Sequence, residues 1–267
     1  MTKDEGAEAR EQVDGVPRLL VLAKARNVLD AFTADSPELT MSQLVARTGL
    51  PMSTCVRIVR NLAYDGLLER SGERYRIGLA IVRWGSLALT GRSLVAVAVP
   101  ALEWLRDASG ESAQLCVRDG PFAIAVAAAN SAHSIRRQVN VGEVSVLHAG
   151  STGKTFLAFD RDAAAALGEG PLEPFTARTV TDRAQLFEDV AAVRERGYAV
   201  SIEERNSGAA GITAPVFDTT GAMVASIGIT GPVSRINTAT LDRQVELVRD
   251  AARRIESQLG LHPAASL

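Results

Sequence analysis

The chain has 267 residues, 46% of them hydrophobic and 4% aromatic, which is enough apolar material for a packed core in one large domain or two unequal ones. The longest apolar run covers residues 94–102 and contains Pro100, whereas a membrane-spanning helix needs roughly 20 apolar residues. Residues 1–16 are acidic and lack the basic start and apolar stretch of a secretion signal. We therefore expect a cytoplasmic protein that does not cross a membrane.

Positive charge is concentrated in one part of the chain. Residues 17–77 carry nine Lys or Arg against six Asp or Glu, a net charge of +3, while residues 1–16 and 78–267 carry −3 and −2. A positive balance favours a segment that contacts nucleic acid. A balance this small also occurs on ordinary solvated surfaces, so the motifs must decide.

The cysteines and histidines do not form a metal-binding pattern. Cys55 and Cys116 are far apart, and His133, His148 and His262 are scattered, unlike the paired spacing of a zinc site. Two thiols in a cytoplasmic chain are usually small buried hydrophobes. The sequence predicts no metal ion and no cofactor.

Two helices are expected after an acidic tail, which we predict to be flexible over residues 1–16. Apolar residues recur at helical spacing from Pro17 until the polar stretch 35–37. Thr40 then begins a second helix, because Gln43 follows three positions later and the pair fits a capping box.

A third helix and a hairpin complete this region. Gly49, in the turn 48–51, allows the positive φ that a tight corner requires. The third helix is expected over residues 52–65. Residues 67–70 and 74–77 flank a polar turn and are typical of a β-hairpin. Three helices followed by a hairpin predict a winged helix-turn-helix over residues 17–78.

The third helix of a winged helix-turn-helix lies in the major groove of DNA. Its outward side here carries hydroxyl, guanidinium and amide groups, which can contact phosphates or pair with base edges. The wing adds arginines suited to phosphates or the minor groove. The predicted contacts to double-stranded operator DNA are Ser42, Ser53, Thr54, Arg57, Arg60, Asn61, Arg70, Arg74 and Arg76. A helical bundle with a solvated polar face is the alternative.

Residues 79–93 are expected to form a linker helix. Leu79, Val82, Leu87 and Leu89 give this segment more apolar surface than a free linker needs. That composition is typical of a helix packed against a partner subunit, so we expect a homodimer or a dimer of dimers.

The remainder of the chain mixes helical and strand patterns. Strands connected by hairpins predict a mostly antiparallel sheet flanked by helices, which makes the whole chain α+β. The expected helices cover 95–108, 155–159, 182–196 (ended by Gly197) and 241–259, and the expected strands cover 112–118, 122–128, 135–141, 198–203, 212–217 and 223–230.

Three groups of motifs, in this order, resemble the IclR family of bacterial regulators, and the resemblance runs from Pro17 to Leu259. They are LVARTGLPMST (44–54) with Arg57 and RYRIG (74–78); Val141-Gly142 with LHAGSTGK (147–154); and RERGYA (194–199) with EE (203–204) and APVFD (214–218). The resemblance implies a winged helix-turn-helix, a linker helix and a GAF-like domain over residues 94–267 for effector binding and oligomerisation. It thus implies a ligand-responsive transcription regulator that is not an enzyme.

The resemblance also implies where an effector binds. Family members hold small keto acids through backbone amides and polar side chains, and the matching positions here are Gly150, Ser151, Thr152, Ser201, Gly211, Gly228 and Thr230. Because glycines replace larger polar groups, we expect a roomier and less polar pocket. The backbone N–H groups of Ser151 and Thr152 are expected to hold a carboxylate. The expected effector is larger than pyruvate, such as an amino acid or an aromatic acid.

Other assignments compete with this one. GSTGKT (150–155) is similar to the end of a phosphate-binding P-loop, but that motif needs a Gly where His148 stands. A hydrolase would need a nucleophile with a base in reach, and no Gly-x-Ser-x-Gly sequence is present. A DNA-binding regulator whose C-terminal domain only assembles oligomers remains open.

Four charged or titratable side chains near these motifs have simpler structural roles as alternatives. His148 is expected to bond a backbone carbonyl rather than a ligand, and Lys154 to cap a loop or pair with a carboxylate. Arg136 and Arg137 could bind an anionic effector. Since neighbours on a strand face opposite sides, at most one of them can point into a pocket.

Overall fold

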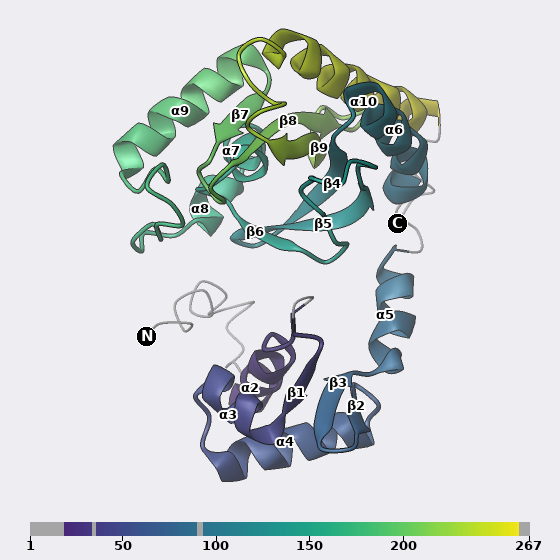
Figure 1. The fold of residues 1–267 in the computed structure, drawn as a ribbon, viewed down its shortest axis with the longest axis vertical. Coiled ribbons are helices and arrows are strands. Elements are labelled where there is room, and N and C mark those ends of the chain that lie inside the picture. Colours follow the sequence, from purple (N-terminus) through teal and green to yellow (C-terminus); the bar gives the residue numbers. More distant parts are fainter. Residues whose placement is uncertain (1–18, 34–35, 90–92, 262–267) are drawn as a thin grey trace. The chain divides into compact units, whose positions relative to one another are not determined.

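A computed structural model of the protein describes residues 19–33, 36–89 and 93–261, which fall into two units, residues 1–92 and 93–267. Helices and strands carry the labels of Figure 1. The predicted acidic tail lies outside the described residues. Among the described helices, none is both long and apolar enough to cross a membrane.

The first unit contains the predicted helix-turn-helix and its wing. Its helices are α2 (Leu20–Leu29), α3 (Met41–Thr48), α4 (Met52–Tyr64) and α5 (Leu79–Leu89), and its strands are β1 (Glu38–Thr40), β2 (Leu68–Ser71) and β3 (Arg74–Ile77). Helices α2, α3 and α4 enclose a core that includes Val28, Leu44, Cys55 and Leu62. The strands form an antiparallel sheet in the order β1-β3-β2, in which β2 and β3 are the wing.

Local signals in this unit are confirmed at the start and end of α3. The Thr40 hydroxyl accepts the N–H of Gln43, whose side chain accepts the N–H of Thr40, so the capping box is complete. Gly49 ends the helix with a φ of 66°. Helix α2 ends at Leu29, earlier than the stop expected at 35–37. Strand β1 was not predicted, because three residues are too few to show alternation and its pairing with β3 decides it.

The second unit is built on a six-stranded sheet. Its order is β6-β5-β4-β9-β8-β7, and every neighbouring pair is antiparallel. The strands are β4 (Ser112–Asp119), β5 (Phe122–Ala129), β6 (Val144–Val146), β7 (Ala199–Ile202), β8 (Ala209–Phe217) and β9 (Met223–Pro232). The helices are α6 (Ser93–Ser109), α7 (Ser151–Phe159), α8 (Ala163–Ala166), α9 (Arg183–Arg196) and α10 (Leu241–Leu261). The α+β prediction, with a mostly antiparallel sheet flanked by helices, is confirmed.

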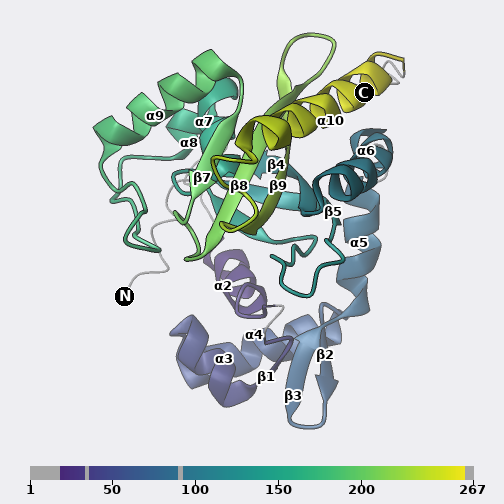
Figure 2. The same ribbon diagram turned by 45° about the horizontal axis from the view of Figure 1, so that its top comes forward.

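Helices cover both faces of this sheet. Helices α6 and α10 lie side by side on one face, and α7 and α9 lie on the other (Figures 1 and 2). Because successive strand residues point to opposite faces, Leu115 packs in the α6–α10 core while its neighbour Cys116 packs in the α7–α9 core. The sheet therefore separates two hydrophobic cores, and the polar site described below lies on the α7 side.

Three details of the second unit correct the sequence analysis. The strand expected over 135–141 is absent; this segment is a loop, and the edge strand is β6, which pairs with β5. The Asn130 amide replaces a strand partner here, since it donates to the Val139 carbonyl at 2.9 Å and accepts the Val139 N–H at 2.8 Å. Helix α7 begins at Ser151 rather than at residue 155, and α8 was not predicted.

Candidate functional site

The outer face of α4 presents the polar side chains expected to contact DNA. Ser53, Arg57, Arg60 and Asn61 are exposed and Thr54 is half-buried, while the apolar residues Cys55, Ile58, Val59 and Leu62 are buried. The Asn61 amide donates to the Arg57 carbonyl at 2.7 Å. The Arg57 and Arg60 guanidinium groups have no hydrogen bond or ion pair to the described part of the chain. Both are thus available to a partner.

The arginines of the wing differ in how far their charges are already paired. Glu69 and Arg76 are cross-strand partners, and the Arg76 guanidinium donates twice to one Glu69 carboxylate oxygen, at 2.8 and 3.0 Å. This bond lowers the pKa of Glu69 and raises that of Arg76. Within the described residues, Arg70 bonds only the Gly72 carbonyl, at 2.9 Å, and Arg74 only that of Glu38, at 3.4 Å. Arg70 and Arg74 therefore have the less neutralised charges.

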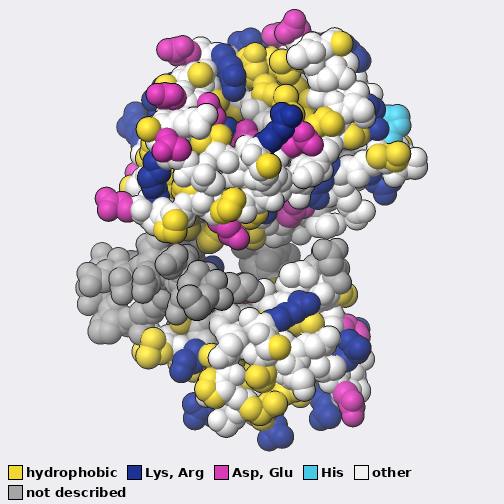
Figure 3. All heavy atoms as spheres, turned by 60° about the vertical axis from the view of Figure 1, so that its left-hand side comes forward, with side chains coloured by type: hydrophobic (Ala, Val, Ile, Leu, Met, Phe, Trp, Pro, Cys, Tyr) yellow, Lys and Arg dark blue, Asp and Glu magenta, His cyan; other side chains and the backbone are white. Residues whose placement is uncertain are grey.

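The exposed groups of this unit are distributed over several elements. Ser42 is exposed at the start of α3. Figure 3 shows Lys and Arg side chains, in dark blue, along the outer edge of the unit on the face drawn. The structure thus leaves the predicted groups at the surface, except for the half-buried Thr54. Of the wing arginines, Arg76 is the one in an ion pair with a carboxylate of the described chain.

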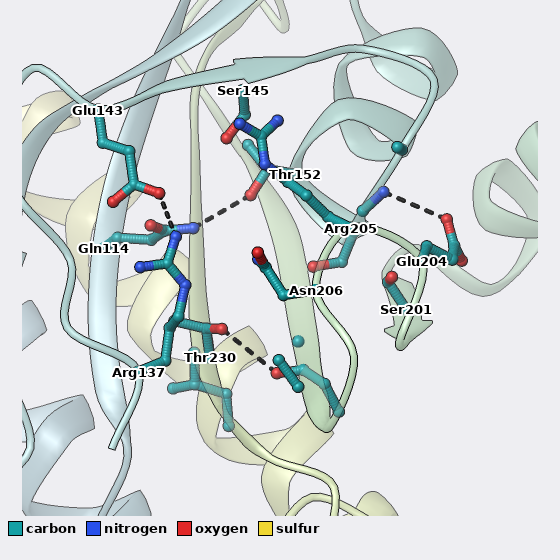
Figure 4. Close-up of a pocket in the computed structure, with 17 residues that line it drawn as sticks. Gln114, Arg137, Glu143, Ser145, Thr152, Ser201, Glu204, Arg205, Asn206 and Thr230 are labelled. Carbon is teal, nitrogen blue, oxygen red and sulfur yellow. Dashed lines mark hydrogen bonds and ion pairs between the residues drawn. The ribbon is translucent and has the colours of Figure 1, made fainter. Parts of the chain in front are cut away.

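A pocket of about 70 Å³ lies in the second unit, where the start of α7 meets strands β4, β7, β8 and β9 (Figure 4). This is several times the space that one water needs, about 10–15 Å³. It is lined by Gln114, Arg137, Glu143, Ser145, Ala149, Gly150, Ser151, Thr152, Ser201, Glu204, Arg205, Asn206, Ala209, Ala210, Gly211, Ile229 and Thr230. Six of the seven predicted effector positions are among them, and Gly228 is not.

The start of α7 faces this pocket. Gly150 precedes the helix with a φ of 96°, a conformation that L side chains rarely adopt. The N–H groups of Ser151 and Thr152 belong to the first helical turn, where no intrahelical acceptor exists. The Gly150 N–H donates to Glu204 at 3.2 Å, and the other Glu204 oxygen accepts the buried Lys154 ammonium at 2.8 Å. Lys154 also donates to Asp189 at 2.8 Å, so its expected pairing with a carboxylate is confirmed.

The glycines do not enlarge the pocket as expected. A Cβ on Gly228 would lie 2.4 Å from the Ile212 carbonyl oxygen and 2.6 Å from the Thr213 hydroxyl, and one on Gly211 would lie 2.9 Å from the Ser151 hydroxyl. The Ser151 and Thr213 hydroxyls bond each other at 2.8 Å and occupy this space. The missing side chains thus permit close packing, and the lining is more polar than expected.

Several charged side chains of the pocket were missed or left open by the sequence analysis. Arg137 lines it and is ion-paired with Glu143, whereas Arg136 is exposed and donates to the His133 carbonyl at 3.0 Å, so one of the two points inward as expected. Arg205 was not predicted. It lies in the β7–β8 turn directly after the Glu203-Glu204 motif, and that position was the only available signal.

His148 does not line the pocket. Its Nε2 atom lies 2.9 Å from the Glu173 carbonyl oxygen, and its ring stacks on Phe175 at 5.8 Å. The expected bond to a backbone carbonyl is confirmed. His148 therefore joins the loop before α9 to the start of α7.

Two family profiles match the chain: "IclR helix-turn-helix domain" over residues 21–72 and "Bacterial transcriptional regulator IclR C-terminal" over residues 86–257. The chain belongs to the IclR family. It is 35% identical over 246 residues to the HTH-type transcriptional regulator BhcR of Paracoccus denitrificans, covering 91% of this chain and 87% of that protein. It is 30% identical over 230 residues to the HTH-type transcriptional repressor AllR of Escherichia coli K12, covering 84% and 85%.

Solved IclR structures share the fold. An IclR homologue from Microbacterium hydrocarbonoxydans, in complex with 4-hydroxybenzoate, matches with a TM-score of 0.76 at 26% identity, over 90% of this chain and 99% of that one. An IclR-type transcriptional regulator from Alicyclobacillus acidocaldarius matches with a TM-score of 0.77 at 24% identity, over 91% and 100%. As an IclR-family member, the protein is a DNA-binding transcription regulator and not an enzyme, which rules out the NTPase and hydrolase assignments.

Proposed function

We propose that the protein is a metabolite-responsive regulator: α4 and the wing bind operator DNA, and the pocket at the start of α7 binds a small carboxylate. It acts in the cytoplasm, where its operator lies. The observation that supports the carboxylate is the position of the pocket at the start of α7, because N–H donors at a helix N-terminus favour an anion. The 4-hydroxybenzoate bound by the Microbacterium homologue is itself a carboxylate. The mostly polar lining favours a compact ligand with further hydroxyl or amide groups.

The DNA assignment is tested with Arg57→Ala. If Arg57 pairs with a base edge, its loss weakens operator binding by about 1–3 kcal/mol and relaxes specificity at one position. Arg26→Ala removes the same charge from α2, where Arg26 pairs with Asp30, and is the matched control. Binding is measured by fluorescence anisotropy on the operator and on scrambled DNA. If Arg57→Ala and Arg26→Ala weakened operator binding equally, α4 would not be the helix that recognises the base sequence.

We also propose a homodimer or a dimer of dimers that binds an inverted repeat, since operator symmetry follows protein symmetry. Leu79, Val82 and Trp84 on α5 have large exposed apolar side chains within this unit. The side chains of Leu87 and Leu89, expected on the same surface, lie outside the described residues. Val82→Asp should weaken the dimer, measured by sedimentation at micromolar concentration; an unchanged oligomer would exclude this surface.

The pocket is tested with Ala209→Leu, which places a larger side chain at the pocket lining. We expect this variant to bind operator normally and to lose its response to carboxylates. Ala222→Leu, at an exposed position outside the lining, is the matched control. The alternative, a domain that only assembles oligomers, predicts that no carboxylate in a metabolite screen changes operator affinity or melting temperature.

A further inference from the structure

Arg205 lines the pocket, and its guanidinium has a buried donor without a partner among the described residues. Its Nη2 atom donates to the Val144 carbonyl at 2.8 Å. Its Nη1 atom is buried and has no hydrogen-bond partner among the described residues. In Figure 4 the Arg205 side chain extends toward Ser145. Ser145 follows Val144, whose carbonyl accepts the Arg205 bond, in strand β6. A buried and unpaired charged donor is costly, so it points to a missing acceptor.

The carboxylates of the pocket do not supply this acceptor. Glu204 accepts the Lys154 ammonium with one oxygen and the Gly150 N–H with the other. Glu143 accepts the guanidinium of Arg137. Among the charged side chains that line the pocket in the described structure, Arg205 is therefore the one whose charge no carboxylate directly bonds. Burial lowers the pKa of Arg205 from its usual value, which reflects the same lack of compensation.

A carboxylate is the acceptor that fits a guanidinium best. A guanidinium presents planar N–H donors that fit a carboxylate closely, and bonds between two charged groups are the stronger ones. Ser151 and Thr152, whose N–H groups belong to the first turn of α7, line the same pocket. We propose that the Arg205 guanidinium binds the carboxylate of the effector and selects acids over their neutral analogues. This inference rests on the effector pocket proposed above.

The loop before α9 holds Arg205 in place. The guanidinium carbon lies 5.5 Å from the centre of the Phe175 ring, which in turn stacks on His148. Thr176 donates to the Glu203 carbonyl and Thr179 to that of Glu204, both at 2.6 Å, which fastens the turn that carries Arg205. Phe175 is thus a positioning residue, and His148 supports it.

The experiment uses acetate as the minimal carboxylate and acetamide as its neutral counterpart. The melting temperature of the full-length protein is measured in sodium acetate and in sodium chloride at equal ionic strength. A carboxylate that binds only the folded state raises it, and we expect a difference of about 2 °C or more for the wild type. Acetamide should have no such effect. Arg205→Gln should abolish the difference, and Arg178→Gln, a matched control that loses an exposed ion pair with Glu203, should retain it.

Each outcome decides the proposal. An acetate-specific shift that persists in Arg205→Gln would overturn the Arg205 proposal. The α7 N–H groups would then be the site that binds the carboxylate, and the proposed function would stand. An absence of any acetate-specific shift in the wild type would overturn both the Arg205 site and the carboxylate assignment. If Arg205→Gln does not fold, Arg205→Lys replaces it. Lysine has one nitrogen and cannot reproduce the separate N–H groups of the guanidinium, so this variant should show a smaller acetate shift than the wild type.

The role of Phe175 has its own test. Phe175→Tyr keeps an aromatic ring beneath the guanidinium and should preserve the acetate shift, whereas Phe175→Leu should reduce it. A merely structural residue would lower the melting temperature in both variants without changing the acetate response. Equal acetate shifts in the Tyr and Leu variants would show that the ring does not position Arg205.

Discussion

Lys154→Met tests the charge network beneath the pocket. Lys154 is 4% exposed and lies 2.8 Å from both Glu204, 10% exposed, and Asp189, 42% exposed. At this distance the Coulomb attraction is about 6 kcal/mol for an effective dielectric constant of about 20, and about 1.5 kcal/mol for that of water. Removing the ammonium leaves Glu204 buried without a counter-ion. We expect the free energy of unfolding to fall by about 3–5 kcal/mol.

Asp189→Asn is the matched control, since its bond has the same length but its carboxylate is half in water. It should cost less than about 1 kcal/mol. Unfolding in urea is followed by the fluorescence of Trp104, on α6, in a Trp84→Phe background so that the signal reports the second unit alone. The double variant Lys154→Met with Glu204→Gln should lose less than the sum of the single changes. Equal costs for the two carboxylates, or a loss below 1 kcal/mol for Lys154→Met, would refute the argument from burial.

Three further outcomes follow from single positions. Gly153→Ala should lower the free energy of unfolding of the second unit by more than about 2 kcal/mol, because its Cβ would lie 2.3 Å from the Leu147 carbonyl oxygen; Gly170→Ala, in open space, is the control in the same urea titration. Thr40→Ala should cost about 0.5–2 kcal/mol in the first unit through loss of the cap, and Thr40→Ser should restore most of it. Burial raises the pKa of Cys116 to about 12, so in a Cys55→Ser background the folded protein should not react with a thiol reagent at pH 9, and rapid reaction without unfolding would contradict this burial.

Local rules made much of the fold predictable. The capping box of Thr40 and Gln43 and the turn at Gly49 involve residues within a few positions of one another, so their geometry is set by short-range sterics and hydrogen bonds. Gly197 likewise ends α9 with a φ of 83°. The wing followed from two short strands around a polar turn. The strand predicted over 135–141 was wrong. The side chain of Asn130, which precedes this segment by five positions, bonds the N–H and the carbonyl of Val139 in place of a neighbouring strand.

The pocket shows where this reasoning stops. The sequence pattern placed the start of α7 four residues late, at 155 instead of Ser151, but the family resemblance identified six positions of the lining. The sequence could not show that Thr213 lies against Gly228, because that contact arises only when β8 pairs with β9. It also could not show that Arg205 meets Val144 and Phe175, which lie on other segments of the chain.

By itself, then, the sequence determined most of the helices, the ends of α3 and α9, the wing and the family, since each depends on spacing or on motifs read along the chain. Only the tertiary structure decided which charges remain unpaired. Arg76, Arg137 and Arg205 are the same residue type, yet two of them bond a carboxylate and the third has a buried donor with no partner among the described residues. The difference arises because strand pairing and loop packing bring a Glu to the first two, whereas Arg205 bonds a backbone carbonyl, that of Val144.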